Sequence, residues 1–351
     1  MNVRSAFEAQ AIACEKLGSP FMGQLCRLFA RRLSPGHPVA DRVLGWPGDV
    51  TSNGQSVPLR MAGALHALVL TKVDDALVSV YPPSVVEDDR LWDVVEAAMI
   101  AHKAQLMQWL ESPPQTNEVR RAAAMMMTAA LLRARTGLPL AVSELGASAG
   151  LNLLFDRFGM VVDGRIYGAP ESAVLLRPEW QGPQPPALPI EIIDRAGVDL
   201  RPIDARDPVQ ALRLLAYLWP DQPHRLALTR AAIALLDDPP QSGDAAQWLE
   251  GRLARAIPGA VHMVFHTIAW QYFPAETKRR CAAAIDAAAM RATPDAPLAH
   301  MSMEADDTPG SAALTLRFWN GRDATGRLQT LGRIDFHGRF LDILPASQWQ
   351  L

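Results

Sequence analysis

Apolar side chains recur at helical spacing through the first part of the chain. The spacing predicts one helix over Leu91–Leu110, which Pro113 stops, and another over Glu118–Thr136. Gly137 follows the second helix directly, as a C-terminal capping glycine does. We therefore expect residues 1–136 to form a helical N-terminal region.

The pattern changes at Leu138, where a short apolar run, LPLAVSEL, ends in a glycine-rich stretch. Helical periodicity resumes in GLNLLFDRF, so this part of the chain predicts a strand, a tight loop and a helix. An irregular section follows, with a hairpin tip at Val162–Arg165. Pro178–Pro189 is too rich in proline for a helix or a central strand.

Strands and helices alternate in the remainder of the chain. We expect strands at Ile190–Asp199, Gln241–Ala245, Val261–His266, Leu298–Met303, Ala312–Trp319 and Arg333–Leu344. The expected helices are Pro208–Trp219 (with Asp207 as its cap), Leu226–Leu236, Ala246–Ile257 and Glu276–Ala289. Such alternation predicts an α/β domain over residues 137–351, with a mainly parallel sheet and an antiparallel hairpin at its C-terminal edge.

The composition is typical of a folded protein, and its net charge gives no reason to expect a highly charged partner. Hydrophobic residues make up 49% of the chain and charged residues 20%, and the formal net charge is -3. We therefore expect a small-molecule partner rather than nucleic acid or a membrane. Three scattered cysteines and the charges at Glu8, Glu15 and Lys16, where a signal peptide would be apolar, favour a cytoplasmic protein.

The glycine-rich stretch VSELGASAGLNL has two incompatible interpretations. As G-x-S-x-G, it is the nucleophile elbow of an α/β-hydrolase, with Ser148 as the attacking group and His300 or His337 available as a base. An elbow usually follows several strands and an oxyanion loop, whereas mainly helices precede Ser148. A serine esterase is the alternative hypothesis.

As a cofactor loop, the same stretch has its parts in the expected order. Gly146 and Gly150 remove side chains where a ligand touches the main chain, and amides at the start of the following helix can receive a polar group. A dinucleotide motif G-x-G-x-x-G needs glycines where this chain has Ser148 and Leu151. A nicotinamide or flavin dinucleotide is therefore a poor fit.

The arrangement E-x-G-x-S-x-G resembles the first motif of class I S-adenosylmethionine-dependent methyltransferases. The resemblance implies a three-layer Rossmann-like methyltransferase sheet, S-adenosylmethionine as cofactor, and methyl transfer to a small molecule. It extends to Asp199, which resembles the acid that accepts both ribose hydroxyls, and to Asp244 and Ala245, which resemble the adenine-binding segment. The implied cofactor-binding residues of the loop are Glu144, Gly146, Ala147, Ser148, Gly150 and Asn152.

Candidate catalytic residues follow the expected strand Val261–His266. At a strand end beside the cofactor, His266 could take a proton from an attacking group, or could only bind a neighbouring loop. Gln271 and Tyr272 could line a substrate pocket, and Glu304 could orient the substrate. We expect no metal site, because HMVFH lacks the glutamate of the H-E-x-x-H motif.

Over nearly its full length the chain also resembles a bacterial family known only as domain of unknown function 2332. The residues that carry this resemblance are Gly18–Pro20, Glu144–Leu153, Val198–Asp204, Tyr217–Asp221, His266–Tyr272 and Asp335–Gly338. The family implies no activity, so a non-catalytic ligand-binding protein is a third hypothesis. The sequence indicates neither the methyl acceptor nor the oligomeric state.

Overall fold

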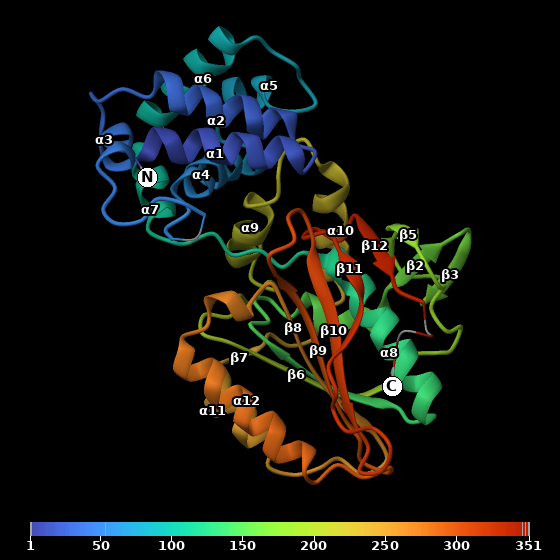
Figure 1. Ribbon diagram of the computed structural model, residues 1–351. Helices are drawn as coiled ribbons and strands as arrows, with labels where there is room; N and C mark the ends of the chain where they lie inside the picture. The colour runs from blue at the N-terminus through green and yellow to red at the C-terminus, as the bar shows by residue number, and fades with distance from the viewer. Residues whose placement is uncertain (1, 53, 346, 348, 350–351) are drawn as a thin grey trace. The chain divides into compact units, whose positions relative to one another are not determined.

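The computed structural model describes residues 2–52, 54–345, 347 and 349 and divides the chain into two compact units (Figure 1). One unit comprises Met1–Thr116 with Asp207–Ala227, and the other Asn117–Arg206 with Leu228–Leu351. The boundary therefore falls about twenty residues before the expected one at 136. The reason is that the helix expected over Glu118–Thr136 is buried on nearly all sides and packs with the sheet unit.

The first unit is helical. Its helices are α1 (Val3–Lys16), α2 (Pro20–Arg32), α3 (Pro38–Leu44), α4 (Val57–Thr71), α5 (Asp75–Val80), α6 (Asp88–Ala101), α7 (Lys103–Leu110) and α9 (Pro208–Ala216). The expected helix over residues 91–110 is two helices, because His102 leaves helical geometry at their junction and its Nε2 lies 3.0 Å from Asp74 Oδ2. Asp207 caps α9 through the amide of Val209, as its position before Pro208 predicts.

Two of the segments that carry the family resemblance join inside this unit. The Ser19 hydroxyl caps α2 and donates to Asp221 Oδ1 at 2.5 Å, and the Phe21 amide donates to Asp221 Oδ2 at 3.0 Å. Gly63 accommodates the Tyr217 ring, since a Cβ at residue 63 would lie 2.5 Å from it. These residues therefore hold the 207–227 segment against the N-terminal helices.

The second unit is built on a nine-stranded sheet with the order β5-β12-β11-β10-β9-β8-β1-β6-β7. The strands are β1 (Leu140–Leu145), β5 (Glu179–Gln181), β6 (Ile192–Asp199), β7 (Gln241–Ser242), β8 (Val261–Thr267), β9 (Leu298–Ala305), β10 (Ala312–Trp319), β11 (Gln329–Ile334) and β12 (Phe340–Ile343). From β7 to β9 all neighbours are parallel, whereas β9 to β12 form an antiparallel meander. The mixed α/β architecture with a mainly parallel sheet is thus confirmed.

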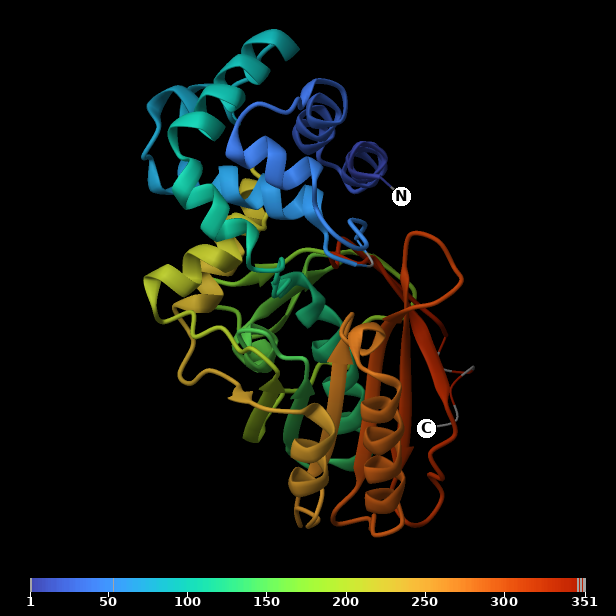
Figure 2. The same cartoon turned by 90° about the vertical axis from the view of Figure 1, so that its left-hand side faces the viewer.

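Helices cover both faces of the parallel strands. On one face, α11 (Ala245–Arg252) and α12 (Ala275–Ala289) lie side by side and pack on Leu145, Val198 and Val264 (Figures 1 and 2). Phe265 points to the opposite face, where its ring meets Phe155 at 6.3 Å between centroids. That face carries the short helix η1 (Val119–Arg121), α8 (Ala122–Thr136) and the 3-10 helix η2 (Leu151–Arg157).

Three local elements can be compared directly with the predictions from the sequence. Gly137 caps α8 in the left-handed conformation with φ +73°, as predicted. The expected hairpin at Val162–Arg165 joins β2 (Gly159–Val162) to β3 (Arg165–Gly168), which form a small separate sheet with β4 (Leu175–Leu176). The helix expected after the glycine-rich loop is the 3-10 helix η2 rather than an α-helix.

The strand expected over Arg333–Leu344 is instead the hairpin of β11 and β12. The buried Asp335 accepts the amides of His337 (2.9 Å) and Arg339 (3.0 Å) and the Arg339 guanidinium (2.8 Å), which turns the chain. Gly338 has φ +68°, and a Cβ there would lie 2.6 Å from the main chain of Arg120. The turn residues therefore interrupt the strand.

α10 (Pro223–Ile233) carries the chain back into the second unit. All three cysteines are free and buried. Within the described residues, we find no helix with the length and apolar character needed to cross a bilayer.

Candidate functional site

The glycine-rich loop follows β1 and is fastened to the end of β6. The amides of Gly146 and Ala147 both donate to the Val198 carbonyl, at 2.9 and 3.0 Å. The Ser148 amide donates to Asp199 Oδ2 at 2.9 Å, and the Ser148 carbonyl accepts the Ile203 amide at 3.0 Å. Two segments of the family resemblance, Glu144–Leu153 and Val198–Asp204, therefore fold as one structure.

The glycines of this loop are explained by close packing within the protein. Gly146 has φ +70°, and a Cβ at this position would lie 2.6 Å from the Ala269 Cβ. Gly150 has φ +77° and faces the Pro240 ring in the same way, at 3.0 Å. The Leu151 amide at the start of η2, a position expected to receive a ligand, donates to Asn117 Oδ1 at 2.8 Å. Most of the loop amides are thus used internally.

Asp199 is the last residue of β6, which pairs with β1 in parallel. Its side chain accepts one amide on each oxygen, from Ser148 and from Arg201 at 2.9 Å. A carboxylate offers about four lone-pair sites, so capacity for further donors remains. Asp199 is half-buried, which leaves part of it accessible.

Asp244 lies next to Asp199, because the Gly243 amide donates to the Asp199 carbonyl at 3.0 Å. Its Oδ1 caps α11 through the Gln247 amide, and its Oδ2 accepts the Thr277 hydroxyl at 3.2 Å. A hollow of about 530 Å³ opens beside it, lined by Ser242, Gly243, Asp244, Gln247, Trp248 and Arg252, among others. Volumes of this size accommodate small ligands.

Buried polar atoms without hydrogen-bond partners cluster in sequence around the loop. Four of these atoms lie on the loop and the residues beside it: Glu144 Oε2, the Ser148 hydroxyl and both amide atoms of Asn152, while others in the described part of the chain, such as the Tyr81 hydroxyl and Glu304 Oε2, lie elsewhere. Glu144, Ser148 and Asn152 are all buried, Glu144 with only 2% of its surface exposed. Unsatisfied buried polar groups cost about 1–3 kcal/mol each, so they indicate water or a ligand as a partner.

Burial raises the pKa of Glu144 well above its usual value, and the Asp199 carboxylate raises it further. The Arg121 guanidinium acts in the opposite direction on the same pKa, but does not cancel the effect of burial. Glu144 therefore favours its neutral form more than an exposed glutamate does.

His266 lies at the end of β8 with both ring nitrogens engaged. Its Nδ1 donates to Glu304 Oε1 at 2.7 Å, its Nε2 lies 3.2 Å from His300 Nε2, and its ring stacks on Trp270. Burial lowers the pKa of His300 to about 3, so that ring is neutral. Burial alone would raise the pKa of Glu304, but the bond from His266 and two backbone amides hold it below its usual value.

The segment after β8 is tied down by Glu304. The amides of Ala269 and Trp270 donate to Glu304 Oε1 at 3.0 and 3.1 Å, beside the bond from His266. Ile268 adopts φ +50°, which is unusual for a β-branched residue. Gln271 and Tyr272 lie in the short helix η3 (Trp270–Tyr272) and are exposed. The structure thus brings His266 and Glu304 together and leaves Gln271 and Tyr272 at the surface.

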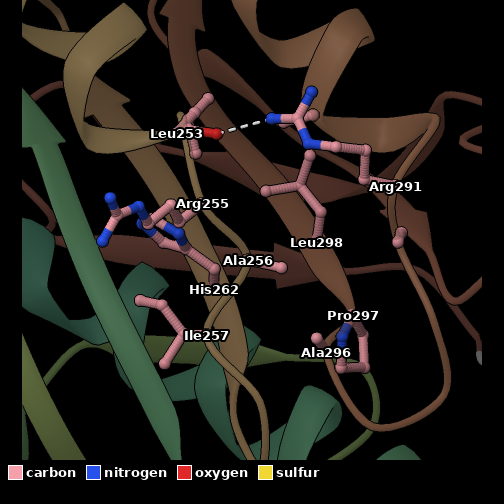
Figure 3. A pocket seen from close by; sticks show the side chains of 11 residues that line it. Leu253, Arg255, Ala256, Ile257, His262, Arg291, Ala296, Pro297 and Leu298 are labelled. Carbon is pink, nitrogen blue, oxygen red and sulfur yellow. Dashed lines mark hydrogen bonds between the residues drawn. The ribbon is translucent and has the colours of Figure 1, made fainter.

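His262 belongs to a different part of the sheet. Its Nε2 lies 2.8 Å from Ser143 Oγ, which also accepts the Arg252 guanidinium at 3.0 Å, and burial lowers the pKa of His262 to about 4. A cavity of about 20 Å³ beside it, lined also by Arg255, Leu253 and Arg291, has room for about one water molecule (Figure 3). The described residues contain no group of three or more metal-ligating side chains placed to hold a metal ion.

Sequence reasoning missed a buried polar segment before α8. Asn117 fixes the start of η2, and Arg121 donates to the carbonyls of Phe336 (2.9 Å) and Thr267 (3.2 Å). Arg121 thus links the end of β8 to the turn between β11 and β12. The only signal in the sequence is the polar run TNEVRR ahead of an apolar helix.

The second unit is therefore an α/β domain in which polar side chains gather at the ends of parallel strands. The family model described as "Uncharacterized protein conserved in bacteria (DUF2332)" matches residues 4–342, and the chain belongs to this family. Neither a curated protein nor a solved structure matches the chain.

Proposed function

We propose that the chain is an S-adenosylmethionine-dependent methyltransferase-like protein that transfers a methyl group to a small molecule. The observation that carries the proposal is the position of Asp199, a half-buried carboxylate with spare acceptor capacity next to the glycine-rich loop. The strand order β7-β6-β1-β8-β9 reverses between β1 and β8. Doubly wound sheets bind ligands at such a reversal, outside the carboxyl ends of the strands.

The residues present fit the cofactor mainly through side chains. Asp199 would accept the two ribose hydroxyls, and Asp244 with the Ala245 amide would meet the adenine next to it. Glu144, Ser148 and Asn152 supply polar atoms that lack partners in the described part of the chain. Main-chain contact at Gly146 is not favoured, because the Ala269 methyl group occupies that side.

When bound, S-adenosylmethionine supplies an electrophilic methyl group on a sulfonium. Methyl transfer depends chiefly on alignment, so the protein needs to position the acceptor and to exclude water. Glu304 fixes His266 and the segment after β8, and His266 would orient this segment rather than take a proton. Gln271 and Tyr272, which are exposed, would contact the methyl acceptor.

Ligand-induced stabilisation tests the cofactor directly. S-adenosylhomocysteine at about 100 times its dissociation constant should stabilise the protein by about 2.7 kcal/mol. Its 2′,3′-dideoxy analogue should bind about 10- to 100-fold more weakly, since two charge-assisted hydrogen bonds are lost. In Asp199→Asn this ratio should fall several-fold, whereas Asp342→Asn, an exposed change on β12, should keep it. Absence of any shift with S-adenosylhomocysteine would contradict the proposal.

One observation favours the hydrolase alternative. Ser148 has φ +54°, and a strained serine is typical of a nucleophile elbow. Its hydroxyl, however, has no hydrogen-bond partner among the described residues, so it binds neither His300 nor His337. A fluorophosphonate probe should therefore leave the wild type unlabelled. Labelling that disappears in Ser148→Ala would replace the methyltransferase proposal with an esterase.

A non-catalytic binding protein would pass the ligand test and fail a turnover test. Incubation with S-adenosylmethionine and pooled small-molecule acceptors should yield S-adenosylhomocysteine, and Asp199→Asn should reduce its rate of formation. Ligand binding with no product under any acceptor would favour the binding protein.

A further inference from the structure

Glu144 lies on β1, between the two strands that pair with β1. On β1 it is paired with Gly197 of β6 on one side and with Phe265 of β8 on the other. Its side chain is 2% exposed, and its Oε2 has no hydrogen-bond partner within the described residues. Most buried polar atoms in proteins have a hydrogen-bond partner, so an unpartnered carboxyl oxygen needs an explanation.

The charged groups that face Glu144 come from two other elements. Asp199 at the end of β6 disfavours a second negative charge, and Arg121 of η1 favours it. Arg121 also donates to the carbonyls of Thr267 and Phe336, so its charge is shared with those oxygens. A carboxyl group in such surroundings keeps its proton until another positive charge comes near.

We infer that Glu144 senses the charge of the ligand: it is protonated in the free protein, and it ionises when a positively charged ligand binds at the loop. In this step the O–H bond of Glu144 breaks, the proton leaves to solvent, and the carboxylate remains beside the ligand cation. A neutral ligand leaves the O–H bond intact. The inference rests on the proposed function, in which the sulfonium of S-adenosylmethionine supplies the charge and its neutral product, S-adenosylhomocysteine, does not.

The chemical consequence is a preference for substrate over product. A buried positive charge gains more from a nearby carboxylate than a neutral thioether does, even after the cost of ionising Glu144 is included. Methyl transfer removes that charge, so Glu144 takes up a proton again. The cofactor product is therefore held less tightly than the cofactor itself.

Calorimetry in two buffers of different ionisation enthalpy tests the step near pH 7. S-adenosylmethionine should release close to one proton per ligand from the wild type, and S-adenosylhomocysteine close to none. In Glu144→Gln the proton release should disappear, and the preference for S-adenosylmethionine should fall by about tenfold. Glu171→Gln, an exposed change in the same unit, should behave as wild type. Binding of both ligands with equal proton release in wild type and Glu144→Gln would overturn the inference and leave the proposed function standing.

Stability against pH tests the protonation of Glu144 without any ligand. The unfolded chain gives up this proton near pH 4.5, whereas the folded protein keeps it, so raising the pH favours unfolding. The wild type should lose stability relative to Glu144→Gln as the pH rises above 4.5. Parallel curves for the two proteins would overturn the inference whatever the ligand results. If neither ligand binds the wild type, the proposed function fails, and this inference fails with it.

Discussion

Gly146 offers the sharpest test of why the loop contains glycine. In Gly146→Ala, the new methyl group would meet the Ala269 Cβ at 2.6 Å, far inside the 3.5–4.0 Å of an ordinary carbon contact. Relieving this overlap should cost about 1–3 kcal/mol. The residue would also hold φ +70°, which costs an L-amino acid about 1–2 kcal/mol. Adding the two terms, we expect a loss of about 2–5 kcal/mol in the free energy of unfolding.

Two further variants separate the cost of the overlap with Ala269 from the cost of the backbone conformation. Gly259 has a similar φ, +77°, with no atom within 4 Å of its ideal Cβ, so Gly259→Ala should lose only the backbone term of about 1–2 kcal/mol. Combining Gly146→Ala with Ala269→Gly should recover about 1–3 kcal/mol, because the overlapping methyl group is removed. Urea unfolding without ligand measures all four proteins. If Gly146→Ala cost no more than Gly259→Ala, or if the double variant recovered nothing, the packing explanation would be refuted.

Further expectations follow from two carboxylates in the second unit, the buried Asp335 and the half-buried Glu304. Asp335→Asn should destabilise the protein by about 1–3 kcal/mol in urea unfolding, because the buried Asp335 loses its ion pair with the partly exposed Arg339, while Asp342→Asn should have little effect. Burial alone would raise the pKa of Asp335, but Arg339 holds it below its usual 3.8, so its contribution is present above about pH 4 and is lost as the pH falls through the lowered value. Acid unfolding of the wild type should show this loss, and Asp335→Asn should not. Glu304→Gln should speed amide hydrogen exchange at Ala269 and Trp270, and unchanged exchange would show that Glu304 does not hold this segment.

Features that depend on a few adjacent residues could be predicted from the sequence. Gly137 ends α8, and Asp207 with Pro208 begins α9, because caps act within one turn of a helix. The buried run Leu140–Leu145 is a strand that leads into the loop, as its apolar pattern indicates. The mainly parallel sheet also follows, since strands that alternate with helices have few other ways to pair.

Features that depend on distant residues could not be predicted. Ala269 fills the space beside Gly146, although 123 positions separate them in the chain. The break between β11 and β12 depends on Asp335 binding amides that follow it and on Gly338 lying against Arg120. His266 is a similar case, because only the structure shows that its nitrogens meet Glu304 and His300.

The candidate site is best defined by the polar groups that contacts within the protein do not use. Most groups of the family segments in the second unit are satisfied by contacts within the protein: loop amides by Val198, the segment after β8 by Glu304, and the 335–338 turn by Arg121. The stability of the fold alone accounts for these contacts, and they need no ligand. What they do not use is the spare capacity of Asp199 and the unpartnered atoms of Glu144, Ser148 and Asn152. Because burying polar atoms without partners costs free energy, a function that supplies those partners is the simplest reason for the sequence to keep them.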